Sequence, residues 1–380
     1  MRGVFACVAA LVAGSACGSS EPFDACRASD VVVLSPGYAD QPVAMDVDER
    51  GYVVFWVGWP ADASPDATGV FVARPGEAPV RLVTELQAER VRAVPVAGGH
   101  LACWTPSLAD NDECVVVDAD LHQVVPVFTV GYGRVVSLGR IGTQLFALTS
   151  TVPTEGLTWL VPLDESGTDL APPVQVDCAA FPPGQVAWSD QGLACLVVTD
   201  PTCMFQSSIC QRDLVVHAPD GSVVMKSPEA APYGPTSDPF EPQLAVTQGG
   251  YLLAWSNGPA FTRTIAADGT PGTPLDVGVA RRQLRLLPQG DGFVEVWVES
   301  PDSASSYRLL RAQRLDATGA PSGDPFWLAD PEGDVRVHDT AALVSASTSG
   351  VALAWTADAG TPANPQRFVL FRSLGCDLVP

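Results

Sequence analysis

The chain has 380 residues, a formal net charge of −22 and a single lysine, Lys226. So acidic a chain repels phosphate backbones and anionic lipid, which argues against nucleic-acid binding and against electrostatic docking on membranes. Hydrophobic residues make up 47% of the chain, enough for a core, and 34 glycines with 34 prolines favour dense turns over long helices.

The N-terminal segment has the pattern of an export signal. A basic start, Met1-Arg2-Gly3, is followed by an apolar stretch over 4–13 and by the small residues Gly14-Ser15-Ala16 before Cys17. This order matches the n-region, h-region and cleavage site of a leader, and the apolar stretch is too short for a permanent membrane span. Small residues directly before a cysteine resemble the lipobox of bacterial lipoproteins, although Gly14 stands where that family prefers leucine.

That resemblance implies a signal peptide over 1–16, acyl chains on Cys17 and a lipid-anchored tether over 17–29. The residue after Cys17 is not Asp, which resembles lipoproteins sorted to an outer membrane. An ordinary secretory signal cut nearby is the alternative. Both predict a location in the cell envelope or outside the cell, and the first makes the lipid anchor the only membrane contact.

After the leader, a glycine followed five residues later by a tryptophan recurs along the chain. Two weaker copies, over 142–148 and 192–197, fill the gap between the second and third clear ones, so the seven glycines are spaced 42 to 58 residues apart. A repeat of this length built from strands predicts a propeller or an array. The clear copies are Gly51–Trp56, Gly99–Trp104, Gly250–Trp255, Gly292–Trp297 and Gly350–Trp355.

The sequence pattern of each unit predicts four strands. A semi-apolar strand such as 91–96 leads through a glycine turn to the apolar strand that ends in Trp, and a third strand such as 114–117 and a polar fourth strand follow. Asp and Gly in the second turn, as in Pro219-Asp-Gly-Ser222, suit positive φ angles. We therefore predict a seven-bladed β-propeller of four-stranded antiparallel blades over 30–380, with the repeated Trp packed between blades.

The strand at 30–34 precedes the first unit, and the last unit ends soon after Phe371, so we expect the N-terminal strand to complete the last blade. Cys7 lies in the leader and Cys17 at the lipid site, which leaves an even number of cysteines for disulfides in an oxidising compartment. Spacing favours four pairs: Cys26–Cys376, Cys103–Cys114, Cys178–Cys195 and Cys203–Cys210.

The whole mature chain resembles a set of exported bacterial lipoproteins with repeats of the form G-x-L-x-A-W followed by DADG-x-P. The best matches are Gly250-Tyr-Leu-Leu-Ala-Trp255 with Ala267-Asp-Gly-Thr-Pro271, and the segment 292–297 with Asp316-Ala-Thr-Gly-Ala-Pro321. The propellers of that family mostly have no assigned activity, so the resemblance implies a fold and an exported location rather than a reaction.

Chemistry-bearing residues show no shared spacing. The histidines fall in different units, and the sequence contains no C-x-x-C, H-E-x-x-H or G-x-S-x-G motif, so we predict no metal site, no cofactor and no catalytic set. Loops after the Trp strands should emerge on one rim, where carboxylates offer ligand loops and a potential Ca²⁺ site. The histidines are His100, His122, His217 and His338, and the rim acids are Asp62, Asp66, Asp110, Asp112, Asp200, Glu299, Asp302 and Asp358.

Two functions stay open at this point. The favoured one is a surface-anchored binding or scaffold module for an envelope or extracellular protein, peptide or glycan, because a regular repeat carries no convergent catalytic set. The alternative is a hydrolase or lyase with a site at the ring axis, assisted by calcium, which would need polar side chains from several blades in one pocket.

Overall fold

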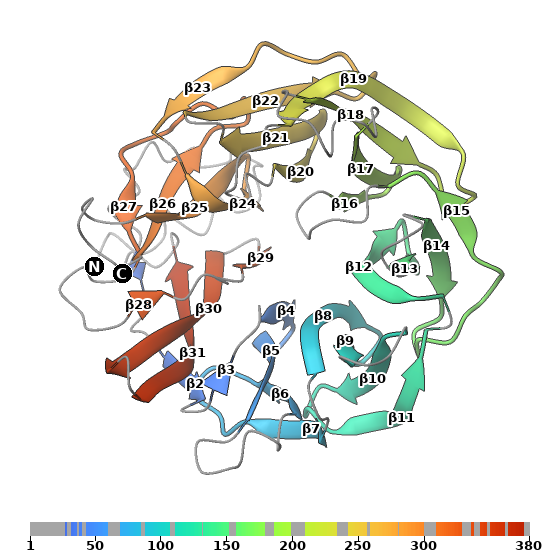
Figure 1. Cartoon of the computed structure of the whole chain (residues 1–380), viewed down its shortest axis with the longest axis vertical. Helices are drawn as coiled ribbons and strands as arrows, with labels where there is room; N and C mark the ends of the chain where they lie inside the picture. Colours follow the sequence, from blue (N-terminus) through green and yellow to red (C-terminus); the bar gives the residue numbers. More distant parts are fainter. Residues whose placement is uncertain are drawn as a thin grey trace, which may run out of the picture.

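The computed structural model describes residues 27–28, 32–35, 38–39, 43–59, 69–84, 88–106, 111–130, 132–151, 157–178, 186–198, 210–233, 242–256, 259–279, 281–299, 309–328, 336–337, 343–347, 350–361 and 364–375. Over these ranges the chain folds into β-strands, which form seven antiparallel sheets around a ring (Figure 1). The predicted seven-bladed propeller is therefore confirmed. The same ranges contain no helix with the length and apolar character of a membrane span.

Blades 2 to 6 are four-stranded meanders in which consecutive strands pair from the centre of the ring outwards. Blade 2 contains β8 (Ala88–Val96), β9 (Gly99–Pro106), β10 (Glu113–Asp118) and β11 (Gln123–Thr129); blade 3 contains β12 (Arg134–Ile141), β13 (Gln144–Ser150), β14 (Thr158–Leu163) and β15 (Val174–Val176). Blade 4 contains β16 (Val186–Ser189), β17 (Gly192–Val198), β18 (Cys210–His217) and β19 (Val223–Tyr233). Blade 5 contains β20 (Gln243–Thr247), β21 (Gly250–Ser256), β22 (Ala260–Ala266) and β23 (Leu275–Gly278); blade 6 contains β24 (Arg282–Gln289), β25 (Gly292–Glu299), β26 (Leu309–Leu315) and β27 (Phe326–Trp327).

Blades 1 and 7 carry additional short strands. Blade 1 contains β3 (Tyr38–Ala39), β4 (Ala44–Asp48), β5 (Gly51–Trp59), β6 (Gly69–Ala73) and β7 (Val80–Thr84), with both β3 and β4 paired to β5. Blade 7 contains β28 (Arg336–Val337), β29 (Leu343–Ser347), β30 (Gly350–Thr361) and β31 (Asn364–Gly375). Its outer strands are β1 (Arg27–Ala28) and β2 (Val32–Ser35), both antiparallel to β31.

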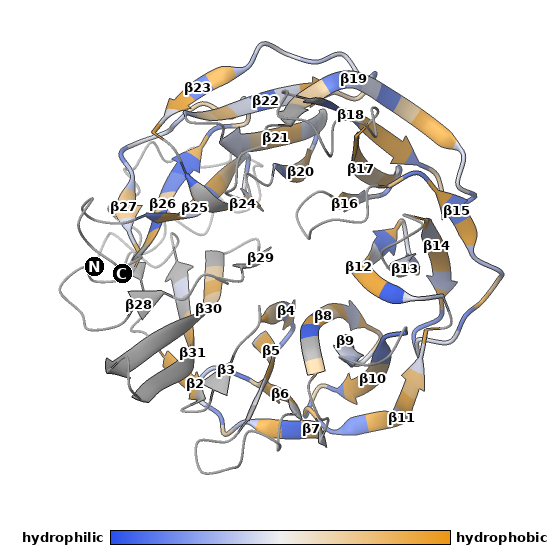
Figure 2. Cartoon of the chain, in the orientation of Figure 1, coloured by the Kyte–Doolittle hydropathy of each residue, from blue (hydrophilic) through white to orange (hydrophobic). Residues whose placement is uncertain are grey.

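The Gly–Trp segments are the second strands of the blades, and they form the core. Every residue of β9 is buried, because neighbouring blades cover both faces of the sheet. Figure 2 shows the contrast with the outermost strands, such as β11 and β19, where apolar and polar stretches alternate at the edge of the ring. Exposed apolar side chains there include Val124, Val127, Val223 and Val224.

The repeated tryptophans pack between blades, as predicted. Trp104 of blade 2 lies in one core cluster with Val53 and Phe55 of blade 1, and Trp355 of blade 7 lies with Val294 of blade 6. Trp56 contacts blade 7 and Trp255 contacts blade 4 in the same way. Each of these four indole rings therefore faces the preceding blade, and burying it stabilises the blade interface by about 3 kcal/mol.

The innermost strands close a second, smaller ring. Contacts run in order through β4, β8, β12, β16, β20, β24 and β29, and β29 returns to β4. All seven run in the same direction, so the ring has two different ends. We call the end where second strands finish, for example at Pro106, the loop rim, and the end where tight turns such as 97–98 join first and second strands the turn rim.

The outer turns on the turn rim repeat one geometry in blades 2 to 6. The glycine of each Asp-containing turn in blades 3 to 6 has a φ between +80° and +86° and faces the preceding blade; these are Gly167, Gly221, Gly269 and Gly319. A Cβ on Gly319 would lie 2.7 Å from Leu252 Cδ1 and 2.9 Å from Thr262 Oγ1 of blade 5. In blade 2 the same position is Leu121, with a φ of +63° and a side chain buried against blade 1. The turns therefore fix the spacing of neighbouring blades.

The N-terminal strand closes the ring. Val32 is opposite Phe371 and Arg27 is opposite Gly375, so strand pairing with the last blade begins before residue 30, inside the segment predicted to be a tether. Cys26 and Cys376 lie outside the described residues, and the disulfide between them stays a prediction.

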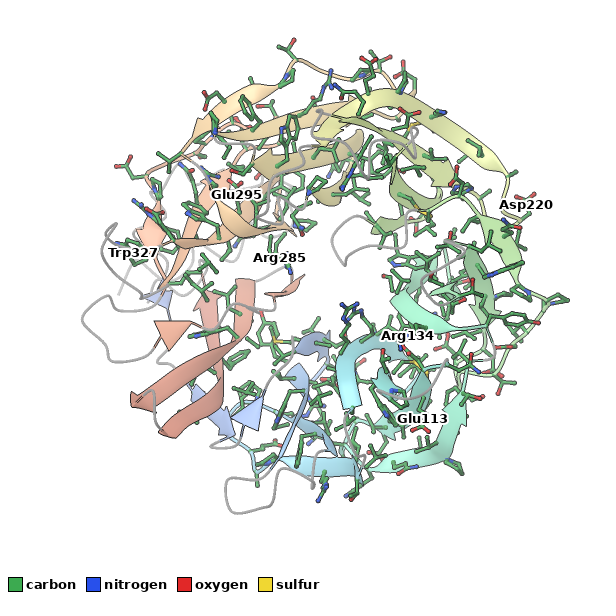
Figure 3. All side chains as sticks on the ribbon, in the orientation of Figure 1. Glu113, Arg134, Asp220, Arg285, Glu295 and Trp327 are labelled. Atoms are coloured by element: carbon green, nitrogen blue, oxygen red, sulfur yellow. A yellow bond between two sulfur atoms is a disulfide. The ribbon has the colours of Figure 1, made fainter. Side chains whose placement is uncertain are left out.

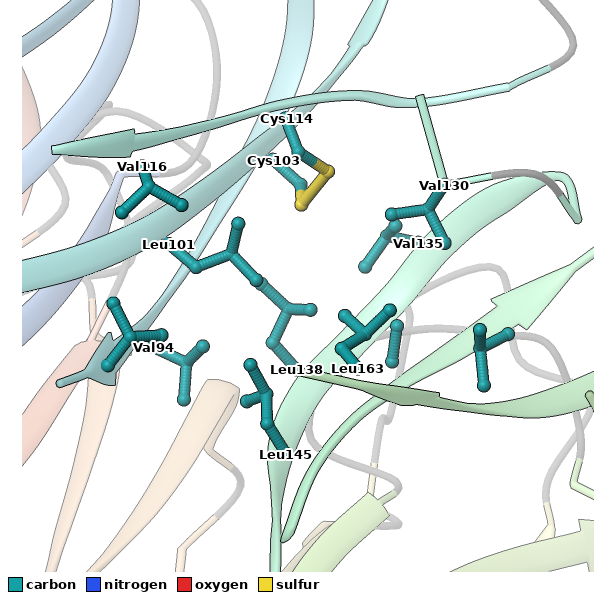
Figure 4. Packing of buried hydrophobic residues seen from close by; sticks show 13 residues of the cluster. Val94, Leu101, Cys103, Cys114, Val116, Val130, Val135, Leu138, Leu145 and Leu163 are labelled. Carbon is teal, nitrogen blue, oxygen red and sulfur yellow. A yellow bond between two sulfur atoms is a disulfide. The ribbon is translucent and has the colours of Figure 1, made fainter. Parts of the chain in front are cut away.

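Two predicted disulfides are confirmed. Cys103 and Cys114 are directly opposite each other on β9 and β10, with 4.0 Å between their Cα atoms, and their sulfurs adjoin the core between blades 2 and 3 (Figure 4). Cys178 follows β15 of blade 3 and bonds to Cys195 on β17 of blade 4, which joins two blades covalently. Cys210 lies opposite Tyr233 in blade 4, while Cys203 lies outside the described residues.

Candidate functional site

Most of the predicted rim acids cannot be placed. Asp62, Asp66, Asp110, Asp200 and Asp302 lie outside the described residues, as do Cys17 and His338. Asp358 is described in its backbone only, where it is opposite Arg336.

The two described rim acids are bound within the blades. Glu299 accepts a hydrogen bond from Trp297 Nε1 at 2.9 Å and pairs with Arg311 at 2.9 Å, while the Arg311 guanidinium lies over Trp327, 4.9 Å from the ring centroid. Asp112 is buried, and its Oδ2 accepts the Val135 amide of blade 3 at 2.9 Å. Both side chains are therefore engaged within the blade structure.

Asp112 is nonetheless electrostatically unusual. Burial raises the pKa of its carboxyl from 3.8 to about 6, and hydrogen bonds from Thr105 and the Val135 amide and the nearby charges of Arg92 and Arg134 offset only part of that effect. The group therefore changes charge near neutral pH, which an exposed rim carboxylate would not do.

A cleft lies on the turn rim between blades 5 and 6. Its volume is about 830 Å³, within the range of small-molecule and peptide sites. Turns supply most of the walls, because this is the end of the ring where the meanders reverse. The lining residues include Thr247, Gln248 and Gly249 from one turn, Gly290 and Asp291 from another, and Thr270, Pro271, Gly272 and Ala317 from the outer turns.

The floor of this cleft is apolar and largely buried. Val246, Tyr251, Ile265 and Phe293 form it, and the Tyr251 and Phe293 side chains are almost fully buried. Burial raises the pKa of the Tyr251 phenol, although a hydrogen bond with Ser189 of blade 4 opposes the shift. The one charged side chain that lines the cleft among the described residues is Asp291, which is exposed and lies 3.6 Å from Arg314.

A smaller cleft, of about 180 Å³, lies on the other side of the same turn, between blades 4 and 5. Ser189, Asp190 and Gln191 form its blade 4 wall. The two clefts share Val246, Thr247, Gln248 and Tyr251, so the turn between β20 and β21 stands between them as a ridge.

His100 joins blades 1 and 2 in a buried polar network. Its Nδ1 lies 2.7 Å from Asp46 Oδ2 and its Nε2 lies 3.1 Å from Asp48 Oδ2, and Arg74 binds both carboxylate oxygens of Asp48. Burial alone would raise the pKa of Asp48, but hydrogen bonds from Arg74, the Arg50 amide and His100 together lower it from 3.8 to about 2. The histidine is therefore held at a blade interface.

The other two described histidines do not join it. The ring nitrogens of His217 lie 3.1 Å from the Gly221 carbonyl and 3.2 Å from the Asp177 carbonyl, while His122 is exposed. Within the described ranges no group of three His, Cys, Asp or Glu side chains is arranged to hold a metal ion.

Comparisons with known proteins assign no family. No family model matches the chain, and no curated protein matches it. Among solved structures, the chain is similar to a neuraminidase-like protein of A/flat-faced bat/Peru/033 (9% identity, 92% of this chain and 89% of that chain, TM-score 0.48). It is also similar to the AfRom2 CNH domain (9% identity, 91% and 99%, TM-score 0.49) and to a prolyl endopeptidase (13% identity, 87% and 47%, TM-score 0.44).

Proposed function

We propose that the chain is an exported binding module whose propeller holds a segment of a partner protein in the cleft between blades 5 and 6. The observation that carries this proposal is the cleft of about 830 Å³ on the turn rim. Its walls are turns fixed by the blade meanders, so the site is formed before a ligand arrives, and binding costs little ordering of the protein.

The lining favours a peptide over a glycan. An apolar floor accepts aliphatic side chains, and the glycine-rich turns present main-chain donors and acceptors to an extended segment. A sugar ring would stack on an exposed aromatic face, but Tyr251 and Phe293 are only 4% and 3% exposed. Asp291 is the single described charge in the lining, so we expect the bound segment to be uncharged or weakly basic.

Binding is preferred to hydrolysis on the observed contacts. His100 and His217 are held by neighbouring blades, and Glu299 is paired with Arg311. No specific contact of the described residues supports the alternative hydrolase or lyase, with or without calcium.

A displayed library of random peptides and an array of neutral glycans test the ligand class on the mature chain. The Ala317→Trp variant fills the large cleft from an exposed position of the outer turn, while Ala267→Trp places the same ring at the same turn position beside the small cleft. We expect enriched peptides with aliphatic side chains, weakened at least tenfold by Ala317→Trp and little changed by Ala267→Trp. Binding that survives Ala317→Trp, or enrichment of glycans alone, contradicts the proposal.

We further propose that the protein is anchored outside the cytoplasm through a lipid on Cys17. Two disulfides support an oxidising, extracytoplasmic compartment, and the leader pattern over 1–16 supports cleavage before this cysteine. Cys17→Ser should release the protein from the membrane fraction, whereas the control Cys7→Ser, within the leader, should not. Mass spectrometry of the N-terminal peptide then identifies the cleavage position and the acyl chains.

A further inference from the structure

Arginines gather on the innermost strands at one end of the ring. Arg90 and Arg92 lie on β8, Arg134 is the first residue of β12, and Arg285 lies on β24. Each of these arginines lies at or beside a residue that pairs with the later half of the second strand of its blade. For example, Arg92 is opposite Cys103 and Arg285 is opposite Val296. Their shared register therefore places all four toward the loop rim.

These guanidiniums approach one another around the axis. Arg92 donates from Nε to the Val136 carbonyl of β12 at 3.1 Å, which fixes it beside blade 3. Burial, followed by the positive charges of Arg90 and Arg285, lowers the pKa of Arg92 from 12.5 to about 10, while the charge of Asp112 opposes the shift. Because Arg285 belongs to blade 6 and Arg92 to blade 2, they can influence each other only across the centre of the ring. Figure 3 shows Arg285 at the inner side of its blade, facing that centre.

The described counter-charge that acts on both Arg92 and Arg134 is a single carboxylate. Asp112 is the carboxylate that acts on both Arg92 and Arg134, and its own raised pKa of about 6 leaves it partly protonated at mildly acidic pH. The Nε of Arg134 is buried without a hydrogen-bond acceptor among the described residues. In a chain with 43 acidic and 21 basic side chains, this gathering of arginines is not a consequence of composition.

We propose that the loop-rim end of the axis is a binding site for an oxyanion with two or more negative charges, held by Arg90, Arg92, Arg134 and Arg285. Guanidinium groups present paired N–H donors that match the oxygens of a carboxylate or phosphate. A bound oxyanion removes the mutual repulsion of the arginines and gives the buried Arg134 Nε an acceptor. The site lies at the opposite end of the ring from the peptide cleft, so it stands or falls independently of that proposal.

Titration calorimetry on the mature chain tests the site with two probes, inorganic phosphate and citrate, against sodium chloride at equal ionic strength. Binding of phosphate alone assigns a phosphate group, binding of citrate alone assigns a polycarboxylate, and binding of both assigns multiply charged oxyanions in general. Each of these supports the proposal. If neither probe binds beyond the chloride control, the proposal is overturned.

Substitutions of single arginines test where on the protein the oxyanion binds. Arg285→Gln and Arg90→Gln should each weaken the dissociation constant at least tenfold, and Arg285→Lys should weaken it less because it keeps the charge but loses the paired donors. Arg314→Gln is the matched control, since it removes one charge from the same blade on the turn rim, where Arg314 pairs only distantly with the exposed Asp291. Arg90 is exposed, so its variant decides the matter if the Arg285 variant does not fold. Affinity that is equal in wild type and in the Arg90 variant overturns the assignment.

Discussion

His100 is a fully buried imidazole between two carboxylates from a different blade. Removing it leaves Asp46 buried without its histidine partner, while Asp48 keeps Arg74 and the Arg50 amide. We expect His100→Ala to lower the free energy of unfolding by about 3 kcal/mol or more, because an uncompensated buried charge is costly. Denaturant titration measures the loss. His122→Ala is the control and should change stability by less than about 0.5 kcal/mol, since that side chain is exposed.

Asp112 should give the protein a pH-dependent stability. Its folded-state pKa of about 6 is above the ordinary value of 3.8, so the folded chain binds a proton that the unfolded chain does not bind between those values. Its contribution to stability is therefore greatest below pH 4 and is lost as the pH rises through 6.

The Asp112→Asn variant checks this linkage, because it keeps an oxygen acceptor for the Val135 amide and cannot titrate. The stability of the variant relative to wild type should fall by about 2 kcal/mol between pH 7 and pH 4, measured by urea unfolding. A constant difference across that range would show that Asp112 does not titrate there. Asp48 titrates in a separate pH range. Because its pKa is lowered to about 2, its contribution to stability is present above pH 4 and is lost as the pH falls toward 2.

The sequence predicted the roles of some of these individual residues but not of others. The Cys103–Cys114 bond followed from strand spacing, because adjacent hairpin strands leave few choices of partner. The buried role of Asp112 did not follow, because one more or one fewer residue in a loop decides whether a carboxylate faces solvent or an amide. The axial arginines were missed for the same reason, since an inner strand has no pattern that tells its inward side from its outward side.

Among the structural elements, the outer turn does more than reverse the chain. Gly319 combines a left-handed backbone with a close approach to Leu252 and Thr262 of blade 5, and Thr262 Oγ1 donates to the Gly319 carbonyl at 2.8 Å. Gly76 has a φ of +87°, near the +83° of Gly319, but open space around its Cβ position. Comparing substitutions at the two glycines therefore separates the free-energy cost of a positive φ from the cost of a clash with the neighbouring blade.

We expect Gly76→Ala to cost about 1 kcal/mol, the price of a positive φ alone, and Gly319→Ala to cost about 2–3 kcal/mol. Thermal and urea unfolding of both variants give the comparison. Equal losses would mean that the turn glycines serve only the turn and not the blade interface. The sequence predicted a positive φ at Gly319 from the Asp and Gly of its turn, but it contained no sign that Leu121 occupies the equivalent position in blade 2.

The second strands were the most predictable elements. Their glycine, apolar run and tryptophan repeat because each must fit between two blades, so the same physical demand recurs seven times. Even the weaker copies at 142–148 and 192–197 form β13 and β17 in the predicted order. The clefts were not predictable, because glycine, proline and threonine in turns carry the same sequence signal whether or not they line a site.

At the scale of the whole molecule, stability depends on ring closure. Leu34 on β2 is 3% exposed and packs with Val369 and Phe371 of β31, whereas its neighbour Val33 is 55% exposed. Leu34→Ala should lower the free energy of unfolding by about 3 kcal/mol and increase proteolysis of blade 7. Val33→Ala, on the other face of the same strand, should have little effect. Equal effects of the two variants would show that β2 does not close the ring.

The pairing of β2 with β31 also determines when the ring can close during synthesis of the chain. Ribosomes make β2 before blades 1 to 6 and β31 after them, so the edge that β2 must cover does not exist until all of those blades have been made. Blades 2 to 6 are local meanders that mature one after another, while the two ends wait for each other. A growing chain therefore carries β2 without its partner while six blades are made, and a chain that terminates before β31 never acquires the strand that would cover it.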